Sequence, residues 1–180
     1  MLRGVLLSMS RSERLKQLAS DAPPARAMVD RFVAGEQPSD AVRATGELIT
    51  SGRLVTLDRL GEDVLDRAQA EATRDAYLEL LGALHDAGLT SGAEVSVKLS
   101  AVGQALPDDG EKVALEFAHE ICAKAGEVGT TVTLDMEDHT TTDSTLGILR
   151  TLRAEFPWVG AVLQAYLRRT ESDCRDLATE

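Results

Sequence analysis

Residues 94–99 read Glu94-Val95-Ser96-Val97-Lys98-Leu99, a short run in which apolar and polar side chains alternate. Because successive side chains on a β-strand point to opposite faces, this alternation predicts a strand with one apolar and one polar face. Further β-rich runs lie at 54–57, 130–134 and 159–166. Amphipathic helical patterns separate these runs, at about 63–88, 111–127 and 143–155, and another begins near Glu171. Regular alternation of strand and helix patterns favours βαβ units and a parallel sheet.

Two closures of such a sheet differ in where they place polar residues. A doubly wound nucleotide-binding sheet carries a Gly-x-Gly-x-x-Gly turn after its first strand, and the sequence has no such motif. A (β/α)₈ barrel places its chemistry at the C-terminal ends of the strands. Polar residues do follow the predicted strands here, namely Asp58, Lys98, Ser100, Asp135 and Gln164. We therefore expect an α/β fold, a partial TIM-type (β/α)₈ barrel of about four βα units preceded by N-terminal helices.

The chain has 180 residues, whereas a whole barrel takes about 250. We expect an N-terminal helical segment at 1–52, including a helix that begins at Ser39-Asp40 and runs through Ile49. Residues 53–180 are then the first half of a (β/α)₈ barrel. A half-barrel leaves strand edges open, which predicts pairing with a C-terminal half or with a second copy of the chain.

Composition excludes several classes of function. The formal net charge is −11, which argues against nucleic acid and against electrostatic capture by anionic lipid. The sequence has no apolar run of the roughly 20 residues that a membrane helix needs. Its two cysteines do not make a disulfide framework. We therefore expect a protein of a reducing cytoplasm.

Strand alternation points to a candidate site formed by Lys98, Asp135 and Gln164. Lys98 is either a cation that meets a substrate or cofactor, or an edge-strand lysine that faces water. Gln164 binds either the rim of a heterocycle or a neighbouring strand. The segment Asp135-Met136-Glu137-Asp138-His139 has three open interpretations: a divalent-metal site, one inward catalytic carboxylate at Asp135, or a solvated acidic loop.

Five segments resemble the proline dehydrogenase family in order and spacing. They are Arg31-Phe32-Val33-Ala34-Gly35, Val55-Thr56-Leu57-Asp58-Arg59-Leu60-Gly61-Glu62, Val95-Ser96-Val97-Lys98-Leu99-Ser100-Ala101-Val102-Gly103, Leu134-Asp135-Met136-Glu137-Asp138-His139-Thr140 and Val162-Leu163-Gln164-Ala165-Tyr166-Leu167-Arg168-Arg169-Thr170. The resemblance covers nearly all of this chain and the N-terminal half or so of the family's catalytic domain. It implies a flavin-binding distorted (β/α)₈ barrel. The implied reaction oxidises L-proline to Δ1-pyrroline-5-carboxylate, by hydride transfer to FAD, and passes the electrons to a membrane quinone.

The resemblance also implies roles for single residues. Lys98 matches the family lysine that helps to hold the proline carboxylate, and Asp135 matches the active-site, catalytic aspartate. Met136 and Gln164 match positions that contact FAD, Met136 through its backbone and Gln164 through hydrogen bonds to the flavin. The resemblance implies no metal. The membrane quinone that the resemblance implies, together with the lack of a membrane helix, predicts a peripheral contact at the inner face of the membrane for a protein of the cytoplasm.

The family also has later segments that this sequence lacks, an arginine-bearing strand and a Tyr-x-x-Arg-Arg run that grips the substrate carboxylate. We therefore expect the isolated chain to bind FAD weakly and to oxidise proline poorly. Two alternatives stay open on the residues alone. One is a lyase or aldolase that uses a metal held by Asp135, Glu137 and His139, or a Schiff base on Lys98. The other is a non-catalytic half-barrel that serves as an assembly module.

Overall fold

A computed structural model describes residues 33–35 and 37–179 of the chain. The elements, in order, are α4 (Pro38–Thr50), β1 (Val55–Asp58), α5 (Arg67–Asp86), the 3₁₀ helix η1 (Thr90–Gly92), β2 (Ala93–Lys98), the 3₁₀ helix η2 (Leu99–Val102), α6 (Gly110–Val128), β3 (Val132–Asp135), α7 (Thr142–Arg153), β4 (Gly160–Ala161) and α8 (Thr170–Leu177). Helix α4 agrees with the helix expected from Ser39 to Ile49. The rest of the predicted helical segment 1–52 falls largely on residues 1–32, which lie outside the described residues.

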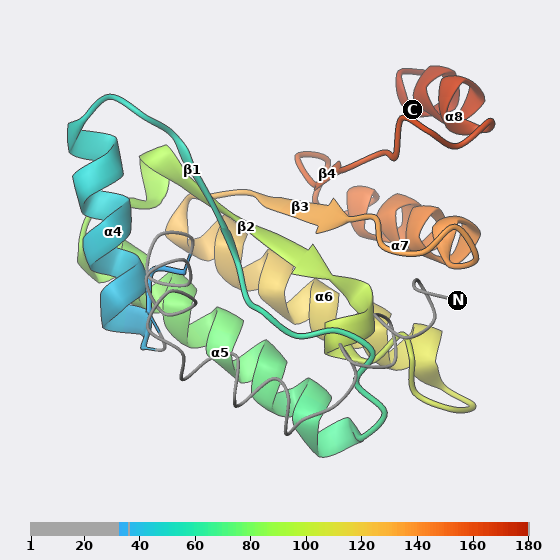
Figure 1. The fold of residues 1–180 in the computed structure, drawn as a ribbon, viewed down its shortest axis with the longest axis horizontal. Coiled ribbons are helices and arrows are strands. Elements are labelled where there is room, and N and C mark those ends of the chain that lie inside the picture. The colour runs from blue at the N-terminus through green and yellow to red at the C-terminus, as the bar shows by residue number, and fades with distance from the viewer. Residues whose placement is uncertain (1–32, 36, 180) are drawn as a thin grey trace, which may run out of the picture. The chain divides into compact units, whose positions relative to one another are not determined.

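The strands form one parallel sheet. In the described part of the chain its order is β1-β2-β3-β4, so each strand pairs with the next along the sequence (Figure 1). The pairing aligns Lys98 on β2 with Asp135 on β3, and Asp58 on β1 with Ser96 on β2. Parallel neighbours in chain order with a helix in each connection are the arrangement of (β/α)₈ barrels, and the predicted α/β class is confirmed.

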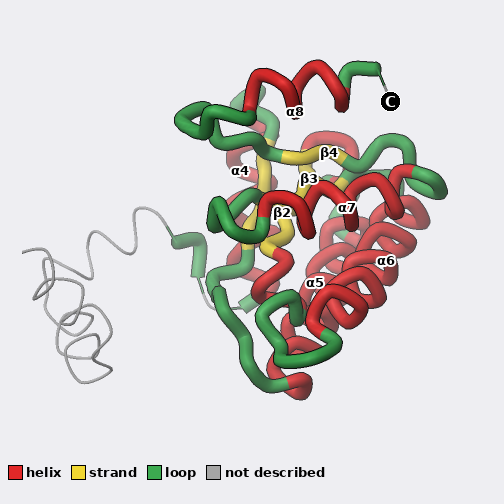
Figure 2. The backbone as a smooth tube through the Cα atoms, turned by 90° about the vertical axis from the view of Figure 1, so that its right-hand side faces the viewer, coloured by secondary structure: helices red, strands yellow, loops and turns green. Residues whose placement is uncertain are grey.

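Helices α5, α6 and α7 lie on one side of the strands (Figure 2). The core between them contains Val95 and Val97 of β2 and Leu134 of β3, all fully buried, packed with Phe117 of α6 and Leu149 of α7. Ser96, Lys98, Thr133 and Asp135 alternate with these apolar residues and point the other way. The alternation predicted for residues 94–99 is confirmed, and β3 shows the same pattern. In both strands it directs the polar groups away from the helices.

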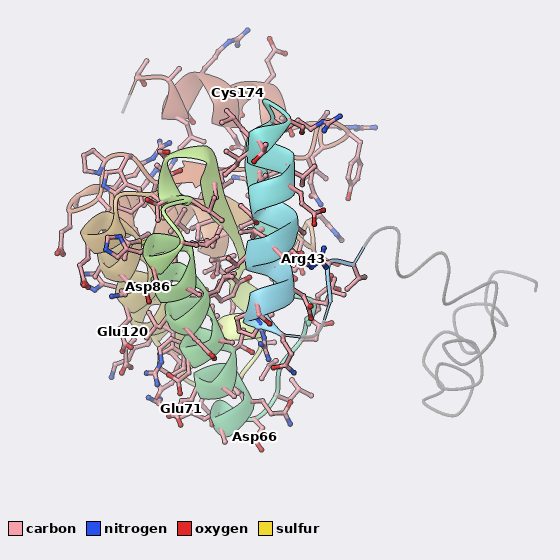
Figure 3. All side chains as sticks on the ribbon, turned by 90° about the vertical axis from the view of Figure 1, so that its left-hand side faces the viewer. Arg43, Asp66, Glu71, Asp86, Glu120 and Cys174 are labelled. Carbon is pink, nitrogen blue, oxygen red and sulfur yellow. The ribbon has the colours of Figure 1, made fainter. Side chains whose placement is uncertain are left out.

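A capping side chain marks the start of α5, and a glycine marks the end of α6. Asp66 caps α5 by accepting a hydrogen bond from the backbone N–H of Ala68 at 2.8 Å, so α5 begins later than the predicted residue 63. Gly129 follows α6 with a φ of +78°, a left-handed conformation that glycine adopts easily. Figure 3 shows Asp66 and Asp86 at the two ends of α5. On the described residues, no helix is long and apolar enough to cross a membrane.

The prediction for the fourth strand was partly wrong. The apolar run 159–166 suggested one long strand, yet β4 contains only Gly160 and Ala161. The backbone N–H of Val162 still donates to the carbonyl of Leu134 at 2.9 Å, after which the chain leaves the sheet. The carbonyl of Gln164 then accepts the N–H of Leu167 at 3.2 Å, which closes a turn. Gln164 therefore lies in the loop beyond β4 and not within a strand.

Candidate active site

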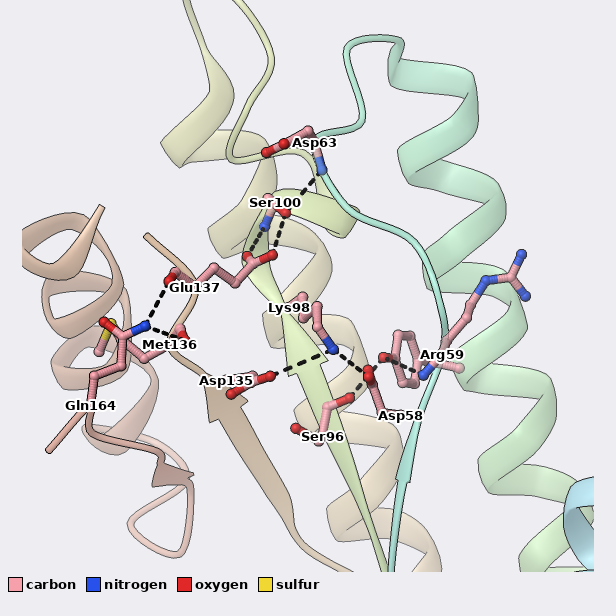
Figure 4. A network of polar contacts seen from close by, with 11 residues as sticks. Asp58, Arg59, Asp63, Ser96, Lys98, Ser100, Asp135, Met136, Glu137 and Gln164 are labelled. Carbon is pink, nitrogen blue, oxygen red and sulfur yellow. Dashed lines mark hydrogen bonds and ion pairs between the residues drawn. The ribbon is translucent and has the colours of Figure 1, made fainter. Parts of the chain in front are cut away.

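Lys98 stands at the C-terminal end of β2, between the strand-end residues of β1 and β3. Its ammonium group forms ion pairs with the carboxylates of Asp58 and Asp135, the second with 3.5 Å between Nζ and Oδ2 (Figure 4). The Lys98 side chain is 13% exposed, against 32% for Asp58 and 30% for Asp135. The lysine is thus the inner member of a charged triplet across three strands, and the alternative of an edge-strand lysine facing water is wrong.

The surroundings of Lys98 keep its side chain charged. Burial by itself lowers the pKa of Lys98, but the hydrogen bond and charge of Asp58, together with Asp135, outweigh it and raise the pKa above its ordinary value. A lysine that forms a Schiff base needs a lowered pKa, so that the neutral amine can attack a carbonyl carbon. The site therefore favours Lys98 as a cation and not as a nucleophile.

Asp58 is a site residue whose pairing with Lys98 the sequence analysis missed. A usable signal was present, because the tetrapeptide Val-Thr-Leu-Asp occurs twice, at 55–58 and at 132–135. The two copies are β1 and β3, and they flank β2 on either side. Tyr77 of α5 supports this end of β1: its buried hydroxyl donates to the carbonyl of Ser96 at 2.7 Å and accepts the N–H of Arg59 at 3.2 Å.

The carboxylates after β3 point in different directions. The Glu137 carboxylate accepts hydrogen bonds from the hydroxyl of Ser100 at 2.7 Å and from its backbone N–H at 3.1 Å. Asp138 accepts hydrogen bonds from the N–H and hydroxyl of Thr140, both at 2.8 Å, and pairs with the exposed His139 at 3.0 Å. Within the described residues, no group of three or more His, Cys, Asp or Glu side chains is arranged to hold a metal ion. The metal-site interpretation is not favoured.

Gln164 approaches the same strand ends from the loop after β4. Its side-chain nitrogen donates to the carbonyl of Glu137 at 2.7 Å and to that of Met136 at 3.3 Å (Figure 4). Two carbonyl acceptors fix the amide orientation, because an amide oxygen in that place would face two other oxygens. The amide oxygen Oε1 is then buried without a hydrogen-bond partner among the described residues. Buried polar atoms are seldom left unpaired, so this oxygen is suited to accept a hydrogen bond from a ligand.

A pocket of about 420 Å³ opens at these strand ends, within the size range of small-molecule sites. It is lined by Glu62, Asp63, Lys98, Asp135, Met136, Glu137 and Asp138. Lys98 is the one basic residue in this lining. Gln164 is not part of the lining and reaches it through Met136 and Glu137. Another hollow, of about 360 Å³ at the start of α6, contains none of the predicted site residues.

The arginines after Gln164 supply no further cation to the pocket. Arg169 pairs with Asp173 at 2.8 Å and with Asp143 at 2.7 Å, so its charge joins α8 to α7. Arg168 is exposed and lies outside the pocket lining. The described pocket thus has more negative than positive groups, and an anionic ligand group needs positive charge beyond Lys98.

Parallel strands in chain order, with a lysine, two aspartates and a buried amide at their C-terminal ends, define a partial (β/α)₈ barrel with an active-site-like opening. A family model described as "Proline dehydrogenase" matches residues 41–180. The chain belongs to the proline dehydrogenase family.

Individual relatives agree with this assignment. A proline dehydrogenase of Deinococcus radiodurans is 43% identical over 148 residues, which cover 81% of this chain and 47% of the relative. Proline dehydrogenase 1 of Bacillus subtilis strain 168 is 34% identical over 177 residues, covering 98% of this chain and 57% of the relative. The chain therefore spans about half the length of these curated relatives.

Solved structures show the same fold. The crystal structure of proline utilization A (PutA) from Bdellovibrio bacteriovorus, inactivated by N-propargylglycine, superposes with a TM-score of 0.76 at 26% sequence identity. The match covers 86% of this chain and 19% of that protein. A Bradyrhizobium japonicum PutA mutant superposes with a TM-score of 0.64 at 22% identity, over 92% of this chain and 19% of that one.

Proposed function

We propose that this chain contributes the first strands of a proline dehydrogenase active site, which oxidises L-proline to Δ1-pyrroline-5-carboxylate. The observation that carries the proposal is the strand-end group of Lys98, Asp135 and Gln164 in a chain of this family. Chemically, the reaction removes a hydride from the ring carbon next to nitrogen and a proton from the nitrogen. The chain must therefore orient a small zwitterionic amino acid beside an electron acceptor.

The residues present fit FAD as that acceptor. The buried, unpartnered Oε1 of Gln164 can accept a hydrogen bond from the N–H of a flavin pyrimidine ring. We propose Gln164 and the buried Met136, through its backbone, as the residues that hold the flavin. Bound FAD supplies the hydride-accepting ring, and the protein supplies orientation and charge.

Lys98 and Asp135 are the proposed substrate groups. The Lys98 ammonium, kept charged by its two carboxylate neighbours, is suited to a hydrogen bond with the proline carboxylate. Asp135, which is partly exposed, can accept a hydrogen bond from the substrate's ring nitrogen, and this is the contact that makes it the proposed catalytic residue. The surplus of carboxylates suits the positively charged amine of proline. Its carboxylate requires cations in addition to Lys98, and the resemblance implies that these lie in later segments of the family's proteins.

A quinone is the proposed final acceptor of the electrons, reached by peripheral contact with a membrane. This part of the proposal rests on the family resemblance.

The test is the visible absorption of the purified chain with FAD, without oxygen, before and after addition of L-proline. We expect L-proline but not D-proline to bleach the flavin band slowly, and we expect Lys98→Met to abolish the bleaching. Lys124→Met is the matched control, because Lys124 lies on α6 and pairs with Glu127. Addition of the remaining segment of the Deinococcus relative is expected to accelerate the reaction. Absence of any proline-dependent change in both preparations would contradict the proposed function and favour a non-catalytic assembly module.

A further inference from the structure

Glu137 contacts both of its neighbouring strand ends, through different atoms. Its carboxylate accepts two hydrogen bonds from Ser100, which lies in η2 directly after β2. Its backbone carbonyl accepts the hydrogen bond from the side-chain nitrogen of Gln164, which lies after β4. Residue 137 itself belongs to the loop after β3. One residue therefore joins the ends of three strands.

Ser100 extends this connection to the loop between β1 and α5. Its hydroxyl oxygen accepts the backbone N–H of Asp63 at 3.1 Å, and its carbonyl accepts the N–H of Val64 at 3.2 Å. Asp63 has a φ of +52°, in the left-handed region that non-glycine residues seldom adopt. Such a conformation persists when surrounding contacts hold it, and the hydrogen bonds that Asp63 and Val64 donate to Ser100 do so here.

We propose that Glu137 is a positioning residue, which couples the orientation of the Gln164 amide to the β1–α5 loop through Ser100. Without the anchor on Ser100, the loop carrying the Glu137 carbonyl is free to turn, and the amide loses the acceptor that directs Oε1. The functional meaning of this coupling rests on the flavin role proposed above for Gln164. The coupling itself is a property of the protein without a ligand.

A substitution can remove the charge of Glu137 and still keep the shape and hydrogen bonding of its side chain. Burial is the main cause that raises the pKa of Glu137, and the charge of Glu62 adds to it, while the Ser100 hydrogen bonds and Lys98 act in the opposite direction. Asp63, Asp135 and Asp138 line the same pocket. A glutamine has the same shape without the charge, and its amide can still bond to Ser100. If the role is positioning, Glu137→Gln retains it and Glu137→Ala does not.

The test follows the side-chain NH₂ signals of Gln164 in ¹H–¹⁵N NMR spectra of the full chain, without FAD. The pair of signals lost in Gln164→Ala assigns them. In Glu137→Ala we expect these signals to move toward the position of a solvent-exposed amide. We also expect their exchange with water to become about tenfold faster, which is the effect of losing about one hydrogen bond. Glu137→Gln keeps both near the wild-type values. Glu155→Ala is the matched control, because that carboxylate is exposed and bonds to His119.

Unchanged Gln164 signals in a folded Glu137→Ala chain would overturn the proposal. If that variant does not fold, Ser100→Ala provides the second test, because it removes the hydroxyl that donates to Glu137 and leaves the Glu137 side chain unchanged. We expect the Gln164 signals to move in the same direction in this variant, and unchanged signals there would also overturn the proposal. A Glu137→Gln chain that behaves like Glu137→Ala would also overturn it. FAD affinity, measured in parallel, reports separately on the proposed function: coupling in the NMR spectra without any FAD binding would leave this inference standing and would contradict the flavin role.

Discussion

The ammonium of Lys98 lies between the carboxylates of Asp58 and Asp135, so removing its charge leaves two like charges in close proximity at the sheet end. We expect Lys98→Met to lower the free energy of unfolding by about 1–3 kcal/mol, as for other partly buried charges that lose their partner. Urea denaturation at neutral pH measures this. Adding Asp58→Asn to the same chain is expected to restore part of the lost stability. Equal stabilities of wild type and Lys98→Met would contradict a stabilising role of the two ion pairs.

The pKa of Glu137 determines how stability depends on pH at this site. Because the folded protein raises this pKa, it binds the proton more readily than the unfolded chain does, and ionisation of Glu137 opposes folding. The folded state therefore loses this contribution as pH rises from the ordinary glutamate value through the raised pKa. We expect Glu137→Gln to be more stable than wild type at neutral pH, with the difference vanishing as the pH falls toward the ordinary value. Urea midpoints across that range check the sign, and a difference that grows on acidification would contradict it.

Two glycines in helices have opposite expected effects on stability. Gly110 begins α6, and a Cβ atom there would lie 2.5 Å from the backbone oxygen of Gln104. Gly110→Ala is therefore expected to lower stability by about 1–3 kcal/mol through forced backbone movement. Gly147 lies within α7 with nothing within 4 Å of such a Cβ, so Gly147→Ala is expected to raise stability by about 0.5–1 kcal/mol. Thermal unfolding of both variants tests the pair, and a gain at Gly110 would disprove the contact.

Strand alternation explains how much of the site could be predicted from sequence. The period-two pattern of β2 and β3 gave the correct face for Lys98 and Asp135, and the parallel order brought them into register. In the run 159–166, the alternation of Leu163, Gln164 and Ala165 predicted a strand through Gln164, but β4 ends at Ala161 and Gln164 lies in the turn beyond it. Apolar residues continue past the end of β4, so the sequence did not mark where the strand stops. The Glu137–Ser100 bonds were also beyond prediction, because they depend on how two loops fold back on each other.

The described sheet has two outer strands, β1 and β4, each with one neighbour. Exposed apolar side chains lie next to these strands in the sequence. Leu54, before β1, is 85% exposed, and Val162 and Tyr166, after β4, are 42% and 75% exposed. Open strand edges with apolar flanks promote association. We expect sedimentation velocity to show a mass that rises with protein concentration. In a double variant with Leu54→Lys and Val162→Lys, we expect this rise to be smaller. Ser172→Lys on α8 is the control for added charge, and a constant monomer mass would contradict the expectation.

The central claim of the proposed function is that Gln164, at the strand ends, forms a hydrogen bond with the flavin. The most direct measurement is a titration of FAD with the chain, followed by fluorescence anisotropy, for wild type and Gln164→Leu. We expect weak but saturable binding to the wild type, and an affinity about tenfold lower for the variant, the effect of losing one buried hydrogen bond. Equal affinities of the two chains, or absence of binding to the wild type, would contradict the account.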